Sequence, residues 1–103
     1  MPEDLHPSMH DKLNAETGRI GWPELQRHFA RGVVIRVDGA LDLVQVACAF
    51  VEDDRPAVEG WLKDGQVAKA SLEEARRWEE ARTEFWAVVA APWVLAQEIE
   101  RYQ

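Results

Sequence analysis

The segment FWAVVAAPWVLAQ, residues 85–97, constrains the fold of this chain most strongly, because it is apolar almost throughout and carries a proline near its centre. Read with the two-residue period of a β-strand, it has apolar side chains on both faces, which is typical of a strand covered on both sides. Pro92 has no amide hydrogen for a neighbouring strand, so it is expected at a sheet edge or a bulge. We predict one long, bent strand, interrupted at Pro92, whose second apolar face is covered by helices or by another copy of the chain.

Two other interpretations of this run are a kinked, buried helix and a membrane-spanning helix. A buried helix kinked at Pro92 stays open, because the run is rich in alanine. A membrane-spanning helix is excluded, because the apolar run over residues 85–96 is about half of the ~20 residues that such a helix needs. We therefore expect no membrane association.

An apolar strand edge promotes aggregation unless another strand covers it, and pairing between two copies removes that edge. The sequence therefore predicts a homodimer that associates through the last strand. The candidate interface residues are Trp86, Pro92, Trp93 and Leu95. The first functional hypothesis is a non-enzymatic, self-associating interaction or scaffold protein.

Composition narrows the class of protein further. The 103 residues, 47% hydrophobic and 30% charged, are typical of one globular domain. The formal net charge of −7 repels phosphate backbones and anionic membranes, which argues against a nucleic-acid partner. Cys48 is the single cysteine and cannot form an internal disulfide, and the first twenty residues lack the apolar core of a signal peptide. We expect an acidic, cytoplasmic protein.

Residues 1–7 are expected to be a flexible N-terminus, and residues 8–103 a single domain. Ser8, followed by Asp11 three residues later, predicts the start of a helix that reaches about Thr17.

Glycines separate the first helix from the second. Gly18 and Gly21 are expected to break the helix, and Trp22 restarts it with a proline in the first turn. Gly32 is placed to end this second helix in a left-handed cap.

Alternating β-branched residues, helical spacing of apolar residues and capping patterns assign the rest of the chain. They predict strands over residues 33–37 and 66–70, and a largely buried helix within residues 41–54 whose apolar positions run from Leu43 to Val51. Two further helices are predicted from Pro56 to before Gly65 and from Ser71 to near Thr83. In the last helix, Leu72, Ala75 and Trp78 are expected to face inward and Glu73 to pair with Arg77. The order predicts an α+β fold: a small three-stranded sheet of residues 33–37, 66–70 and 85–97 with about five helices packed against it.

A second functional hypothesis is a small-molecule-binding protein or enzyme. The densest polar group beside an aromatic residue is formed by Asn14, Glu16, Arg19 and Trp22, and it is the candidate ligand pocket. The structural alternative is hydrogen bonding at the helix end together with an exposed ion pair.

No residue pattern in the chain predicts catalysis, a metal site or a cofactor. His6 and His10 have helical spacing but enclose Pro7, and the acidic run of residues 52–54 is better explained by helix capping and solvation than by a bound cation. Cys48 is interpreted as a small buried apolar residue, because no cation adjoins it in sequence.

The chain resembles a bacterial family of unknown function, numbered 2288. The resemblance rests on the segments over residues 12–37, 41–47 and 86–97, and on the spacing of Trp61, Gly65 and Val67. It implies a small, single-domain cytoplasmic protein and gives no activity, cofactor or catalytic residue to carry over. Gly18 departs from the family pattern, which has an alanine there more often, and this departure bears on the length of the first helix.

Overall fold

The computed structural model describes residues 8–100, which form five helices and five strands with turns and loops between them. The predicted flexible N-terminus, residues 1–7, lies outside them. In chain order, the elements are α1 (Met9–Glu16), β1 (Gly18–Gly21), α2 (Trp22–Ala30), β2 (Val34–Val37), α3 (Leu43–Val51), α4 (Arg55–Lys63), β3 (Val67–Lys69), α5 (Leu72–Ala81), β4 (Glu84–Ala90) and β5 (Trp93–Glu98). The α+β class and the five helices are confirmed.

The five strands form one sheet in the order β1-β4-β5-β2-β3. β5 runs parallel to β2, and the other neighbouring strands are antiparallel. The expected three-stranded sheet is therefore wrong by two strands. One was missed because Gly18–Gly21, read as a helix breaker, pairs with Glu84–Ala87 as the edge strand β1.

The second missed strand comes from the apolar run, which is a hairpin and neither one bent strand nor a kinked helix. β4 pairs with β5 from Phe85 opposite Glu98 to Ala90 opposite Trp93. Ala91 and Pro92 make the turn between them, with a cis peptide bond. The hairpin lets the backbones of both halves pair with each other, while Pro92 lies outside the ladder, where no amide hydrogen is needed.

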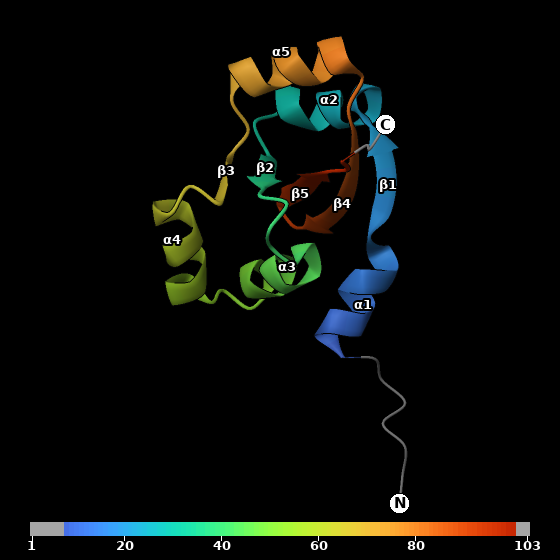
Figure 1. The fold of residues 1–103 in the computed structure, drawn as a ribbon. Helices are drawn as coiled ribbons and strands as arrows, with labels where there is room; N and C mark the ends of the chain where they lie inside the picture. The colour runs from blue at the N-terminus through green and yellow to red at the C-terminus, as the bar shows by residue number, and fades with distance from the viewer. Residues whose placement is uncertain (1–7, 101–103) are drawn as a thin grey trace, which may run out of the picture.

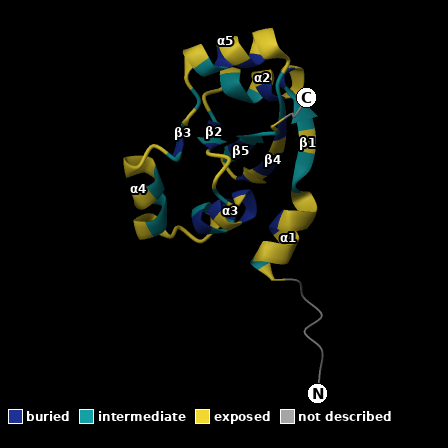
Figure 2. Ribbon diagram, in the orientation of Figure 1, coloured by how far each residue is buried: buried dark blue, intermediate teal, exposed yellow. Residues whose placement is uncertain are grey.

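Helices cover both faces of the sheet, as Figure 1 shows, so the apolar run is enclosed largely by its own chain. α1 and α3 pack on one face around Leu13, Val46 and Leu95. α2 and α5 pack on the other face around Leu25, Trp78 and Phe85. Figure 2 shows the buried residues concentrated between these layers. Helices thus cover the second apolar face of the run, as expected. The remaining helix, α4, lies beside α3 and β3 and has no buried residue of its own.

Local signals placed most helix ends correctly. Ser8 accepts a hydrogen bond from the Asp11 amide at the start of α1, and Ser71 and Glu74 form the expected capping box of α5. Gly32 and Gly65 both have a φ of 76°, in the left-handed region that glycine adopts most easily.

The outward and inward sides of α5 were predicted less well. Ala75 and Trp78 are buried, but Leu72, the first residue of the helix, is 59% exposed. Arg77 forms an ion pair with Glu98 on β5, with Nη2 and Oε2 3.0 Å apart, instead of the expected pair with Glu73. α5 ends at Ala81, and Arg82 follows with a left-handed φ of 52°.

Candidate functional site

The four residues of the predicted ligand pocket lie in different layers of the structure. Trp22, the first residue of α2, is buried, and the centroid of its ring lies 5.8 Å from that of Phe29. Asn14 and Glu16 are exposed on α1, which covers the opposite face of the sheet. Arg19 lies on β1, where it forms an ion pair with Glu84 on the neighbouring strand β4. Trp22 therefore packs in the core, Asn14 and Glu16 lie on a helix surface, and Arg19 forms a cross-strand ion pair.

The four predicted interface residues are also distributed along the hairpin. Leu95 is fully buried in the core and offers no surface to a partner. Trp86 is 42% exposed near the start of β4, between Arg19 on β1 and Gln97 on β5. Pro92 and Trp93 lie at the turn, where Pro92 is exposed and Trp93 is half-buried against the core. The turn is thus the place where predicted interface residues reach the surface together.

Two adjoining hollows open around this turn. The larger, of about 410 Å³, lies between the turn and the junction of α3 and α4. The smaller, of about 310 Å³, lies between α1, the end of α3 and the end of β4. Both are lined by Phe50 and Ala91, so the two hollows share part of their lining surface. We call this surface the hairpin face and define it by Phe50, Val51, Val89, Ala91, Pro92 and Trp93.

Two valines give the hairpin face its exposed apolar character. Val89 is 57% exposed and Val51 is 43% exposed. β1 pairs with β4 only as far as Ala87, so among the described residues no strand adjoins the end of β4 on that side. Val51 is the last residue of α3. Both valines lie in apolar segments of the sequence, and their exposure becomes visible only in the folded chain.

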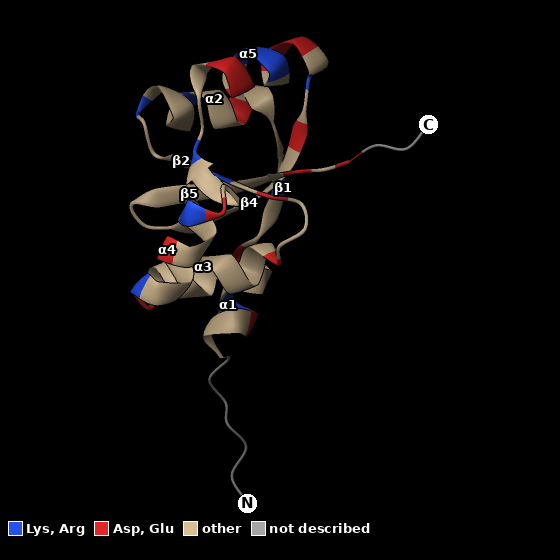
Figure 3. Ribbon diagram, turned by 60° about the vertical axis from the view of Figure 1, so that its left-hand side comes forward, with Lys and Arg blue, Asp and Glu red and all other residues tan. Residues whose placement is uncertain are grey.

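Charged residues of both signs surround the apolar centre. Lys12 and Glu16 line the smaller hollow, whereas Asp53, Arg55 and Glu59 line the larger one. Figure 3 shows the acidic and basic positions of the helices near this end of the sheet. The surface is therefore apolar at its centre and of mixed charge at its rim.

The junction of α3 and α4 presents a loosely held acidic group. Helix capping was expected of both Asp53 and Asp54, and Asp54 caps α4 by accepting a hydrogen bond from the amide of Ala57. Asp53 instead has a φ of 56°, and its Oδ2 lies 3.5 Å from Nε of Arg55 in a pair whose side chains are 76% and 77% exposed. Within residues 8–100, no group of three or more His, Cys, Asp or Glu side chains is arranged to hold a metal ion.

A third hollow, of about 300 Å³, lies at the carboxyl ends of the parallel strands β2 and β5. Its two arginines are already paired: Nε of Arg36 lies 2.7 Å from Oε2 of Glu74, and Arg77 pairs with Glu98. These pairs join α5 to β2 and β5. Their arrangement supports a role in holding the helix on the sheet.

Cys48 lies half-buried on α3 beside a small hollow toward α4. Burial, followed by the negative charges of Glu52 and Asp42, raises the pKa of its thiol above the ordinary value. A raised pKa keeps the thiol protonated near neutral pH and makes it a poor nucleophile.

Comparisons with known proteins give a family and a fold. The model of a family described as "Protein of unknown function (DUF2288)" matches residues 8–98. The chain is also similar to a solution structure of PA1075 from Pseudomonas aeruginosa, determined by NMR, with 44% sequence identity and a TM-score of 0.81 over 95% of this chain and 91% of that chain. No curated protein matches the chain. Across the described residues, no helix has the length and apolar character needed to cross a bilayer.

Proposed function

This chain belongs to DUF2288, a family of unknown function, as its sequence resemblance predicted, and we infer its role from its own surface. We propose that it is a non-enzymatic interaction protein that self-associates through the hairpin face. The proposal keeps Pro92 and Trp93 as interface residues and adds Val51 and Val89. It leaves out Leu95, which is buried, and Trp86, which lies near the start of β4.

The exposure of Val51 and Val89 beside two hollows is the observation that carries this proposal. Isolated apolar residues on a surface are ordinary, but apolar residues gathered in a hollowed, polar-rimmed surface mark interaction sites. Val89 also belongs to a strand whose last residues, within residues 8–100, have no strand on their outer side. Such a strand end is open to contact with another molecule.

The mixed charge of the rim favours a second copy of the chain as the partner. In a twofold contact the same surface meets itself, so each residue of the rim faces another part of the same rim. Lys12 and Arg55 can then lie opposite Glu16, Asp53 and Glu59. A contact through surfaces of one sign would instead bring like charges together and would be opposed by their repulsion.

Sedimentation equilibrium of the full chain, over low to high micromolar concentration, tests self-association. We expect the wild type to shift from monomer to dimer with concentration, and the Val89→Asp variant to stay monomeric, because a carboxylate would be desolvated in the contact. The matched control is Leu72→Asp, which places the same charge at a 59% exposed leucine on α5. Circular dichroism checks that both variants stay folded.

Two outcomes would contradict the proposal. A wild type that remains monomeric at high micromolar concentration removes self-association altogether. Equal weakening by Val89→Asp and Leu72→Asp would place the contact elsewhere. A Val51→Lys variant tests the hairpin face a second time from a different element, because Val51 lies on α3 and Val89 on β4.

A further inference from the structure

The larger hollow of the hairpin face has both aromatic and acidic side chains in its lining. Phe50 comes from α3, and Trp93 comes from the start of β5. Asp53 and Glu59 come from the α3–α4 junction and from α4. From this combination we propose that the hollow binds an alkylammonium group, carried by a free amine or by a lysine side chain.

The aromatic part of the wall suits a cation. Phe50 and Trp93 are both half-buried, so each is packed on one side and accessible on another. The face of an aromatic ring carries negative electrostatic potential and attracts an ammonium group, and tryptophan attracts it most strongly. The alkyl part of such a ligand gains from contact with the same rings and with Pro92.

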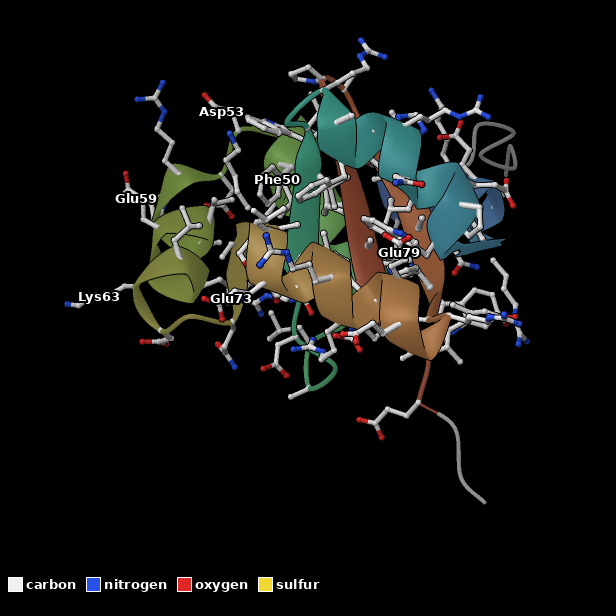
Figure 4. The ribbon with its side chains drawn as sticks, turned by 90° about the horizontal axis from the view of Figure 1, so that it is seen from above. Phe50, Asp53, Glu59, Lys63, Glu73 and Glu79 are labelled. Atoms are coloured by element: carbon white, nitrogen blue, oxygen red, sulfur yellow. The ribbon has the colours of Figure 1, made fainter. Side chains whose placement is uncertain are left out.

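The acidic part supplies the charge partner. Figure 4 labels Phe50, Asp53 and Glu59 and shows the two carboxylates on the α3 and α4 side of the molecule, away from Glu79 on α5. Two carboxylates and one guanidinium line the hollow, so its charge favours a cation over an anion. Its volume of about 410 Å³ lies in the usual range for small-ligand pockets, roughly 300–1,000 Å³.

Arg55 competes with such a ligand. Its guanidinium lies 3.5 Å from the carboxylate of Asp53, and both side chains are more than three-quarters exposed. Exposed pairs of this kind are weak, so an incoming ammonium group can replace Arg55 beside Asp53. Removal of the Arg55 charge should therefore strengthen binding, an effect that a merely structural role of these residues does not predict.

Binding would also affect the proposed dimer, because Pro92 and Trp93 belong both to the larger hollow and to the hairpin face. An ammonium ligand would compete with the second copy and shift the equilibrium toward monomer. This effect on the dimer rests on the proposed function. Binding itself does not, and it can be measured on dilute, monomeric chain.

The test is a titration of ¹⁵N-labelled full chain, at a concentration where it is monomeric, with butylammonium chloride. The readout is the indole N–H signal of Trp93, identified by its absence in Trp93→Phe. We expect a saturable shift with butylammonium and none with butyrate at the same ionic strength. A parallel titration with Nα-acetyl-lysine N-methylamide distinguishes the two sources of the ammonium group by which probe binds more tightly.

Variants locate the site. Asp53→Asn and Glu59→Gln keep side-chain size and should each weaken binding about two- to fivefold, whereas Arg55→Gln should strengthen it by a similar factor. Glu79→Gln on α5 is the matched control and should leave affinity unchanged. The proposal is overturned if neither ammonium probe gives a saturable shift, or if Asp53→Asn and Glu59→Gln bind as Glu79→Gln does. Failure of self-association alone would leave these titrations unaffected.

Discussion

The indole ring of Trp78 meets the ring of Phe85 edge-on, with the centroids 5.0 Å apart and the planes at 85°. Both side chains are fully buried, and the contact joins α5 to β4. Trp22 extends the cluster, with its ring centroid 5.7 Å from that of Trp78. Aromatic pairs in this geometry contribute about 0.5–1.5 kcal/mol beyond the area they bury. The cluster therefore anchors both helices of one layer to the sheet.

Truncation of the central ring tests this role. Trp78→Ala should lower the free energy of unfolding by about 3–5 kcal/mol, because it leaves a large cavity between α2, α5 and β4. Urea denaturation followed by far-ultraviolet circular dichroism measures the change. If that variant does not fold, Trp78→Phe, which keeps an aromatic edge, should show a smaller loss. Trp86→Ala, at a 42% exposed position, is the control, and comparable losses at Trp78 and Trp86 would contradict the assignment.

Two glycines in and just after α4 should respond in opposite directions to the same substitution. Gly60 lies inside the helix, and no neighbouring atom lies within 4 Å of the place that an added methyl group would take, so Gly60→Ala should stabilise the protein by about 0.5–1 kcal/mol. Gly65 has a φ of 76°, so Gly65→Ala should destabilise it by roughly 1–2 kcal/mol. Thermal unfolding of the two variants compares them directly. Shifts of the same sign would refute the backbone explanation.

The two ion pairs of α5 should differ in strength because they differ in exposure. The side chains of Arg36 and Glu74 are 22% and 18% exposed, whereas those of Arg77 and Glu98 are 59% and 39% exposed. Glu74→Gln keeps an acceptor for the capping box, so its expected loss of about 1–2 kcal/mol reports mainly the ion pair. Glu98→Gln should cost less than about 0.5 kcal/mol. Urea titrations in low and high salt measure both, and a larger loss at Glu98 would reverse the ranking.

The thiol of Cys48 should react as a group with a raised pKa. Burial and the nearby carboxylates of Glu52 and Asp42 favour its protonated form in the folded protein. This preference for the protonated thiol contributes stability that is fully present below the pKa of the thiol in the unfolded chain. That stability is lost as the pH rises through the pKa of the thiol in the folded protein. Alkylation by iodoacetamide, measured from pH 7 to pH 10, should therefore rise at higher pH than for a short cysteine peptide. The alkaline loss of stability should be smaller in Cys48→Ala.

The local features of the fold were predictable because they depend on residues close together in sequence. The capping box of Ser71 and Glu74 requires only that a hydroxyl and a carboxylate stand three residues apart at a helix start. Gly65 ends α4 because a left-handed residue closes the last turn there. Such signals placed most of the helices and the short strands β2 and β3.

The arrangement of the C-terminal run was not predictable from the run itself. Both faces of residues 85–97 are apolar, and alternation does not distinguish one long strand from two strands that pair with each other. Residues 18–21 likewise read as a helix breaker, because their strand conformation depends on pairing with Glu84–Ala87 far away in sequence. Sheet partners are long-range choices that a local pattern does not specify.

The candidate site likewise contains some residues that the sequence singled out and others that only the structure revealed. Pro92 and Trp93 stood out in the sequence as apolar residues around a break, but Val51 and Val89 looked like ordinary core residues. In the folded chain Val51 is the last residue of α3, Val89 lies beyond the part of β4 that pairs with β1, and both are exposed. The pairing of aromatic Phe50 and Trp93 with acidic Asp53 and Glu59 also joins residues from three separate elements.

The sequence by itself determined the kinds of elements, most of their ends and the need to cover the apolar run on both faces, because helix propensity, capping and side-chain periodicity act over a few residues. Only the tertiary structure decided that Pro92 closes a hairpin, that Gly18–Gly21 adds a fifth strand and that Val89 remains exposed. Those outcomes depend on which distant segments pair, and pairing is selected by the packing of the whole sheet between its two helical layers.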